Sequence, residues 1–138
     1  MVGRFAIPLF PALSFLPLKE PMDGEFVVRQ SIEYIRRHLD EELSIQKVAH
    51  NSGYSASWIE KNFIKFTGEG IFAHIQRLRI DKAKQLLRET SLSVSEIAYE
   101  VGYNSHARFT LAFVRLTGMP PSRYRKTAAD DLARGAQQ

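Results

Sequence analysis

An internal repeat constrains what this chain can fold into more than any other feature. Residues 43–68, LSIQKVAHNSGYSASWIEKNFIKFTG, resemble residues 92–118, LSVSEIAYEVGYNSHARFTLAFVRLTG. The shared alanines, Ala49 and Ala98, are 49 residues apart, and the shared phenylalanines, Phe63 and Phe113, are 50 apart. The second copy therefore has one extra residue in its turn. Agreement at this spacing predicts two copies of one small supersecondary unit.

Each copy has the pattern of a helix-turn-helix. A glycine follows the alanine by four residues, Gly53 in the first copy and Gly102 in the second. Glycine ends a helix well because it adopts the left-handed conformation that a sharp turn requires. Ser55 and Ser105 then suit the start of a second helix. Two helices joined by a short glycine-containing turn form a helix-turn-helix, whose second helix usually enters the DNA major groove.

The remaining apolar pattern is helical as well. Val28, Ile32, Ile35 and Leu39 are spaced by four, three and four residues, as on one face of an amphipathic helix. The spacing from Ile71 through Leu86 and Leu87 predicts a longer helix from about residue 70 to 88. No segment shows sustained alternation, so strands are not expected. The predicted fold class is therefore all-α.

Local signals predict where several helices begin and end. Ser44 suits an N-cap, Ser93 and Glu96 fit a capping box, and Pro121 suits the first turn of a short last helix. The second helices of the two copies are expected at about residues 56–66 and 106–116. Their core faces are expected to hold an apolar triplet each: Ile59, Phe63 and Phe66, and Phe109, Phe113 and Leu116.

Charge is concentrated in the middle of the chain. The 138 residues carry a net charge of +4, but residues 26–127 alone have 16 basic and 10 acidic side chains, a net charge of +6. The excess points to a polyanionic partner such as nucleic acid, although an ordinary solvated basic surface has the same composition. No apolar run approaches the ~20 residues of a membrane helix, so a membrane partner is not expected.

The N-terminal segment differs from the rest. Residues 1–22, MVGRFAIPLFPALSFLPLKEPM, contain four of the six prolines. Prolines at this density exclude a regular helix, and they interrupt the apolar stretch that a secretory signal would need. We expect residues 1–25 to be a poorly ordered, proline-rich tail.

Enzymatic chemistry has no support in the sequence. The absence of cysteine excludes disulfides, a thiolate nucleophile and cysteine-ligated zinc or iron–sulfur centres. The four histidines do not pair on one helix turn, and no phosphate-binding loop or catalytic triad pattern is present. We predict a protein that is not an enzyme, with no metal and no cofactor.

These motifs together resemble the DNA-binding domain of the AraC/XylS family of bacterial transcription factors, over roughly residues 26–126. The small size resembles the stand-alone MarA/SoxS/Rob type. The matching stretches include Ser52-Gly53-Tyr54-Ser55, Arg77-Leu78-Arg79, Ser95-Glu96-Ile97-Ala98 and Gly118-Met119-Pro120-Pro121-Ser122-Arg123-Tyr124-Arg125. Relatives among DNA-repair methyltransferases need a cysteine acceptor, which is absent here.

The resemblance implies seven helices in two helix-turn-helix subdomains joined by a long linker helix. The expected parts are residues 1–25 as the tail, 26–69 as the first subdomain, 70–90 as the linker helix, 91–127 as the second subdomain and 128–138 as a C-terminal tail. A monomer would insert two recognition helices into successive major-groove segments of double-stranded DNA, about one helical turn apart. Family members mostly activate transcription, often by touching RNA polymerase. The expected location is the cytoplasm, in association with the nucleoid.

Candidate DNA contacts lie opposite the core faces of the two recognition helices. Family base-contacting positions fall on Ser57, Glu60 and Lys61, where Lys61 would donate to guanine and Glu60 would accept from cytosine. Glu60 also fits a solvated surface acid, and Trp58 fits packing as well as a DNA contact. In the second helix the base-contacting candidates are His106, Ala107, Arg108 and Leu111. The phosphate-contacting candidates are Ser55, Lys65, Ser105, Thr110 and Arg115.

Leu111 departs from the family pattern, which frequently has an arginine there. A leucine offers only apolar contact, for example to a thymine methyl group. The first subdomain is then expected to dominate specificity. Leu111 and Glu60 also motivate an alternative, in which the chain is a protein-interaction module that binds RNA polymerase or another regulator and contacts DNA weakly or not at all. A third reading is that the chain is a fragment of a longer regulator.

Overall fold

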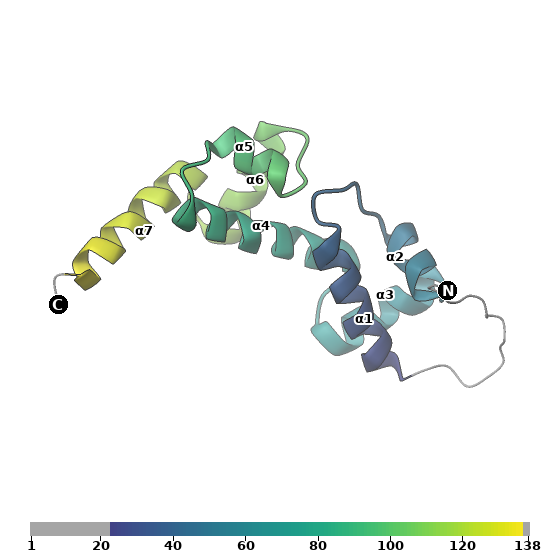
Figure 1. Ribbon diagram of the computed structural model, residues 1–138. Coiled ribbons are helices and arrows are strands. Elements are labelled where there is room, and N and C mark those ends of the chain that lie inside the picture. Colours follow the sequence, from purple (N-terminus) through teal and green to yellow (C-terminus); the bar gives the residue numbers. More distant parts are fainter. Residues whose placement is uncertain (1–22, 137–138) are drawn as a thin grey trace. The chain divides into compact units, whose positions relative to one another are not determined.

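The computed structural model describes residues 23–136, and its ribbon is drawn in Figure 1. These residues form seven helices and no strand, which confirms the predicted all-α class. Of the tail predicted over residues 1–25, residues 1–22 lie outside the described residues, whereas Gly24 and Glu25 already belong to the first helix. The helices are α1 (Gly24–Arg37), α2 (Ile45–Ser52), α3 (Ala56–Thr67), α4 (Ile71–Glu89), α5 (Val94–Glu100), α6 (His106–Thr117) and α7 (Pro121–Ala136).

Contacts group the described chain into two compact units that alternate along the sequence. Unit 1 comprises the residues up to Tyr34 together with Ile45–Gly70, and unit 2 comprises Ile35–Ser44 together with the residues from Ile71 onward. The last turn of α1 and the loop that follows it therefore belong to unit 2. The earlier part of α1, and helices α2 and α3, belong to unit 1. The chain passes into unit 2, returns to unit 1 and then enters unit 2 again.

Unit 1 contains the first helix-turn-helix, α2 and α3. Ser55 ends the turn as an N-cap, since its Oγ accepts a hydrogen bond from the backbone N–H of Trp58 at 3.1 Å. Gly53 has the predicted positive φ, at 82°. The buried apolar side chains of this unit are those of Val27, Val28, Val48, Ala49, Ile59 and Phe63.

Unit 2 contains the second helix-turn-helix, formed by α5 and α6. Both helices pack on α4, and α7 packs against α4 and α6. The capping box predicted at Ser93 and Glu96 is present, and Ser105 caps α6 by accepting from the N–H of Arg108 at 3.2 Å. A line of aromatic rings crosses the core at centroid separations of 5.5, 5.8 and 5.5 Å, formed by Tyr103, Phe109, Phe113 and Tyr124 in turn. These contacts fix the inner face of α6 and leave its outer face to solvent.

The predicted core triplets of α3 and α6 are correct at two positions and wrong at the third. Phe66 is 39% exposed and Leu116 is 45% exposed. Thr67 and Thr117 turn inward instead, at a spacing of four rather than three from the preceding phenylalanine. The Thr67 hydroxyl donates to the carbonyls of Phe63 and Glu69, and Thr117 makes the equivalent pair of bonds. In each copy the threonine directly before the C-cap glycine, Gly68 or Gly118, thus closes the helix end.

Two arginines of unit 2 hold backbone carbonyls at the ends of other helices. Arg79 donates to the carbonyls of Leu39 and Glu41 at 3.1 and 2.7 Å, which fixes the loop after α1. Arg125 donates to the carbonyls of Leu87, Thr90 and Leu92 at 3.1, 3.3 and 2.7 Å, around the end of α4. Backbone carbonyls at and just beyond a helix end have no partner within the helix, so both guanidiniums satisfy acceptors that the helices leave open.

Burial around Arg79 shifts two ionisation equilibria. Desolvation lowers the pKa of the Arg79 guanidinium and raises the pKa of the Tyr103 phenol, while the charge of Arg79 opposes part of the latter shift. The Tyr103 hydroxyl donates to the side-chain oxygen of Gln76, and the Arg79 guanidinium lies 5.7 Å from the ring centre of Tyr103. This network connects α4 to the turn of the second helix-turn-helix.

The last helix is longer than predicted. It begins at Pro121 as expected, but α7 continues to Ala136 and includes most of the segment expected as a tail. Its second half contains Ala128, Ala129 and Ala133, which favour helix. This propensity continues the helix through most of the segment expected as a tail.

Candidate nucleic-acid interface

The outer face of α3 presents most of the residues predicted for the first recognition helix. Ser57, Lys61 and Lys65 are exposed, and the ammonium of Lys65 lies 5.1 Å from the ring centre of Phe66. Ile64 is exposed on the same face, one turn beyond Lys61. The side chain of Ser55 already caps the helix, so any phosphate at this end would meet backbone N–H groups rather than a free hydroxyl.

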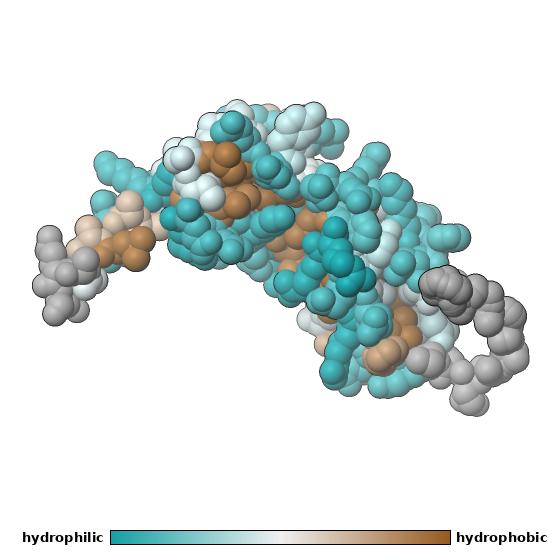
Figure 2. Space-filling model, in the orientation of Figure 1, coloured by the Kyte–Doolittle hydropathy of each residue, from teal (hydrophilic) through white to brown (hydrophobic). Residues whose placement is uncertain are grey.

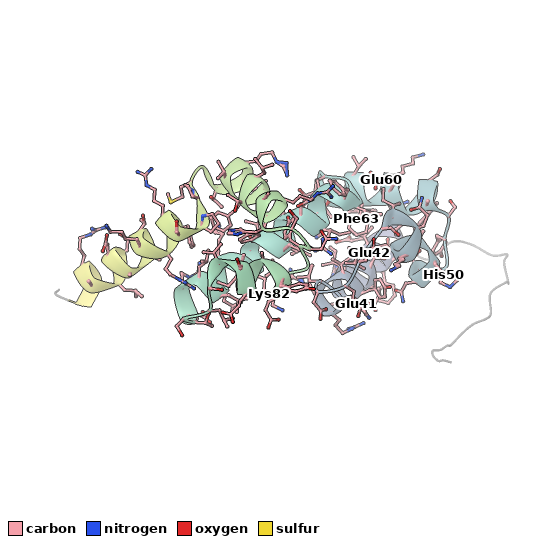
Figure 3. The ribbon with its side chains drawn as sticks, turned by 90° about the horizontal axis from the view of Figure 1, so that it is seen from above. Glu41, Glu42, His50, Glu60, Phe63 and Lys82 are labelled. Carbon is pink, nitrogen blue, oxygen red and sulfur yellow. The ribbon has the colours of Figure 1, made fainter. Side chains whose placement is uncertain are left out.

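Glu60 and Trp58 are held by contacts within unit 1. Glu60 is half-buried, and its carboxylate occupies the space that a Cβ on Gly70 would need. Figure 3 shows Glu60 on the same helix as the buried Phe63. The indole of Trp58 stacks on Tyr54 with ring centres 4.0 Å apart and planes 19° apart. The packing interpretation of Trp58 is supported by this stack.

The outer face of α6 combines arginines with apolar side chains. His106, Ala107, Arg108, Leu111 and Arg115 are exposed, and Leu111 is 72% exposed. Thr110, the remaining candidate, is half-buried. His106 is held by Ser95 of α5, whose Oγ lies 3.3 Å from the imidazole Nδ1.

A groove of about 730 Å³ runs along one side of α6 within unit 2. Arg108, Leu111 and Arg115 line it from α6, and Phe72 and Gln76 line it from α4. Its opposite wall is the loop after α1, which contributes three consecutive acidic residues, Asp40, Glu41 and Glu42. Figure 3 labels Glu41 and Glu42 on this loop. Carboxylates and guanidiniums therefore face the same groove.

The sequence patterns did not indicate two features of this surface, the position of the acidic loop and the exposed apolar pair Ile64 and Val114. The acidic loop is visible in the sequence as Asp-Glu-Glu, but its position beside α6 depends on a contact between segments about 70 residues apart. Ile64 and Val114 are exposed at equivalent positions of the two helices. Their spacing of seven residues from Ser57 and Ala107 indicates in the sequence that they share the outer face with those residues. A seven-residue step is nearly two helical turns and keeps side chains in one row.

Apolar groups also reach the surface elsewhere. Figure 2 shows hydrophobic colour along α7, on which Leu132 is exposed. Within residues 23–136, no helix is long and apolar enough to cross a membrane. Over the same described range, no three histidine, aspartate or glutamate side chains are grouped so that they could hold a metal ion.

Comparison with known proteins identifies the family. Residues 55–127 match a family described as a helix-turn-helix domain. The regulator YobQ of Bacillus subtilis is 36% identical over 101 residues, which cover 73% of this chain and 42% of YobQ. The regulatory protein SoxS of Salmonella typhimurium is 33% identical over 104 residues, which cover 75% of this chain and 97% of SoxS.

Solved structures agree with this assignment. The DNA-binding domain of the global transcriptional factor AdpA, in complex with a target DNA, superimposes with a TM-score of 0.71 at 25% identity, over 80% of this chain and 97% of that domain. This chain spans less than half the length of relatives such as YobQ, whereas it spans nearly all of SoxS. From its sequence and its fold, the chain belongs to the AraC family of helix-turn-helix transcription regulators.

Proposed function

We propose that this chain is a sequence-specific, double-stranded-DNA-binding transcription regulator that acts as a monomer. Helices α3 and α6 would each enter a major-groove segment, so that one chain reads two successive segments. The observation that carries the proposal is the shared geometry of the two helices. Each begins at a capping serine, is anchored by buried side chains at equivalent positions and presents basic residues on its outer face.

The roles of individual residues follow from what each side chain presents. Lys61 and Arg108 are the cationic groups suited to guanine acceptors, and Ser57, His106 and Ala107 lie beside them at the starts of the helices. Lys65 lies one turn beyond Lys61 and Arg115 nearly two turns beyond Arg108, and both would meet phosphates, as would the helix N-termini at Ser55 and Ser105. Glu60 and Thr110 are half-buried, so we assign them only minor contacts with DNA. The solved DNA complex of the AdpA domain supports DNA binding by a domain of this fold.

Activation through RNA polymerase is the second part of the proposal. A regulator bound beside a promoter acts by offering polymerase a further contact, and α7 presents exposed surface that α3 and α6 do not use. The protein would act in the cytoplasm, at the nucleoid. In a reconstituted transcription assay, added protein should raise transcript from a promoter that carries the selected site and leave a promoter without it unchanged.

A selection from a library of genomic promoter fragments, followed by a salt titration, tests DNA binding. Purified protein should enrich an asymmetric site, and the logarithm of its binding constant should fall linearly with the logarithm of salt concentration. Six phosphate contacts would give a slope of about −5. Failure to enrich any sequence at low salt contradicts the proposal.

One observation favours the alternative function, a protein-interaction module. Leu111, Phe72 and Tyr99 are 72%, 66% and 75% exposed, and all three line the groove of unit 2. Large exposed apolar side chains that gather at one place often mark a protein contact. If the selection enriches no site, purified RNA polymerase should still retain the chain, and Leu111→Asp should abolish that retention.

A further inference from the structure

The outer face of α6 is organised in rows. Arg108 and Arg115 are seven residues apart and form one row, which lines the groove. Ala107 and Val114 are also seven apart and form a second row, which does not line it. Leu111 lies between the two rows and is the most exposed large apolar side chain of the helix. The centre of the face is therefore apolar, and its cations lie along one edge.

The outer face of α3 differs from that of α6 at its central position. The two helices have the same length and are related by a shift of 50 residues. At the centre, Lys61 of α3 corresponds to Leu111 of α6. Along the edge, Trp58 and Lys65 correspond to Arg108 and Arg115. A cation therefore occupies the centre of the first face, whereas a leucine occupies the centre of the second.

The chemistry of the two centres differs in a way that DNA distinguishes. An ammonium donates hydrogen bonds to the N7 and O6 acceptors that guanine presents in the major groove. A leucine donates none, and a polar base edge pressed against it would lose its water without compensation. Among the base edges of unmodified DNA, the C5 methyl group of thymine is the apolar feature exposed in the major groove.

We propose that the centre of α6 reads thymine through its C5 methyl group, with Leu111 as the specificity-determining residue and Ala107 and Val114 as its apolar flank. Along the edge, Arg108 is left to read a neighbouring base and Arg115 to meet a phosphate, and both supply the positive charge that an apolar centre lacks. The inference rests on the proposed function and adds the base class to it: thymine at the centre read by α6, guanine at the centre read by α3.

Deoxyuridine substitution tests the inference without changing the protein. Deoxyuridine differs from thymidine only by the missing methyl group, so every hydrogen bond to the base is kept. In the selected site, each thymine is replaced in turn, and the half bound by α6 is assigned from the sequence preference that Leu111→Ala relaxes. The full-length chain should lose about fourfold in affinity at one or two thymines of that half, the value expected for one buried methyl group.

Matched variants locate the effect. Leu111→Ala should bind thymine and deoxyuridine with nearly equal affinity, whereas Lys61→Ala should retain the full difference. The reciprocal exchange is sharper: Leu111→Lys should move the central preference of that half from thymine to guanine, and Lys61→Leu should create deoxyuridine sensitivity in the other half. Because both side chains are exposed, circular dichroism should show unchanged helix content.

The outcomes separate this inference from the function on which it rests. A selected site that binds equally well with thymine and with deoxyuridine overturns the methyl reading while DNA binding stands. No selected site at all overturns the proposed function itself. A third outcome is that the chain retains RNA polymerase or a second copy of itself, and that Leu111→Ala abolishes this retention without changing DNA affinity. That result would assign Leu111 to a protein contact and also overturn the inference.

Discussion

Gly53 and Gly102 occupy equivalent turn positions in the two copies, yet their surroundings differ. Both have positive φ, at 82° and 98°. A Cβ on Gly53 would meet open space, whereas a Cβ on Gly102 would collide with the carbonyl oxygen of Leu39 and with the Arg79 guanidinium. Conformation alone therefore requires glycine at the first site, and conformation together with close backbone approach requires it at the second.

We predict that Gly102→Ala destabilises the protein far more than Gly53→Ala. The first-copy variant bears only the strain of a left-handed alanine, about 1 kcal/mol. The second-copy variant must also displace the loop after α1, so its cost should reach about 3 kcal/mol or more. Urea denaturation of both variants measures the difference. Equal losses would show that the Leu39 carbonyl moves aside freely.

Arg108 is predicted to read a base rather than a phosphate. It lies in the first turn of α6, where its backbone N–H is taken by Ser105 and its side chain is exposed. Arg108→Ala should lower affinity by about 1–3 kcal/mol and relax the preference in one half of the site only. Binding to a panel of single-base variants provides the measurement. A uniform loss on every sequence would reassign Arg108 to the backbone.

At the scale of elements, the acidic loop after α1 opposes the arginine row of α6. Asp40 and Glu41 line the groove that Arg108 and Arg115 also line, so carboxylates lie near the path expected for phosphates. Asp40→Asn combined with Glu41→Gln should raise affinity for DNA about two- to threefold at low salt, the size expected of exposed charges, and less at high salt because exposed charges are screened.

A matched pair controls for net charge. Asp130→Asn combined with Asp131→Asn removes the same two charges from α7, away from the groove of α6. Fluorescence anisotropy titrations should show a smaller gain for this pair. If both pairs raise affinity equally, the loop acts only through the total charge of the chain.

The guanidinium of Arg125 is predicted to stabilise the end of α4 through geometry rather than charge. Its three carbonyl acceptors are spread over residues 87–92, and a planar fork reaches them where a single ammonium cannot. Arg125→Ala should cost about 2 kcal/mol of unfolding free energy, and Arg125→Lys should recover less than half of it. Arg123→Ala, on the exposed side of the same helix, should be nearly neutral in the same thermal and urea measurements.

Element boundaries were largely predictable because caps are local signals. Ser93 with Glu96, the serines before α3 and α6, and the positive-φ glycines each act within a few residues, and the structure has them where the sequence indicated. Phe66 and Leu116 were wrongly predicted to be buried. Residues three and four positions after Phe63 or Phe113 both lie near the core face of the helix, so the spacing alone does not decide between them. Which one turns inward was decided by the threonine hydroxyl that closes the helix end.

For the whole molecule, the repeat correctly predicted two similar units, but it did not indicate that residues 35–44 belong with the second. Arg79 ties this segment to α4, since its acceptors Leu39 and Glu41 precede it by 40 and 38 residues. Nothing in the local pattern of an arginine on a helix specifies such a distant partner. The base-reading assignments likewise remain predictions, because exposure of a side chain does not by itself define the base it meets.

The alternation of the units predicts a conditional effect of Arg79. In the full chain, Arg79→Ala should lower the unfolding free energy by about 2 kcal/mol, since two acceptors lose a charged donor. In a fragment of residues 70–138 those acceptors are absent, so the same substitution should change its stability by less than about 0.5 kcal/mol. Thermal denaturation of the four proteins gives the comparison, and equal effects in both backgrounds would contradict the role assigned to the loop.

The position of residues 35–44 also orders events during synthesis on the ribosome. Unit 1 has all of its residues once Gly70 has been added, and domains generally fold from the N-terminus as they emerge. The loop between α1 and α2 then leaves the exit tunnel together with unit 1, before Arg79 and later Gly102 have emerged to contact it. The nascent chain therefore has a first loop without its partners, and its native contacts form only when the residues of α4 and of the α5–α6 turn become available.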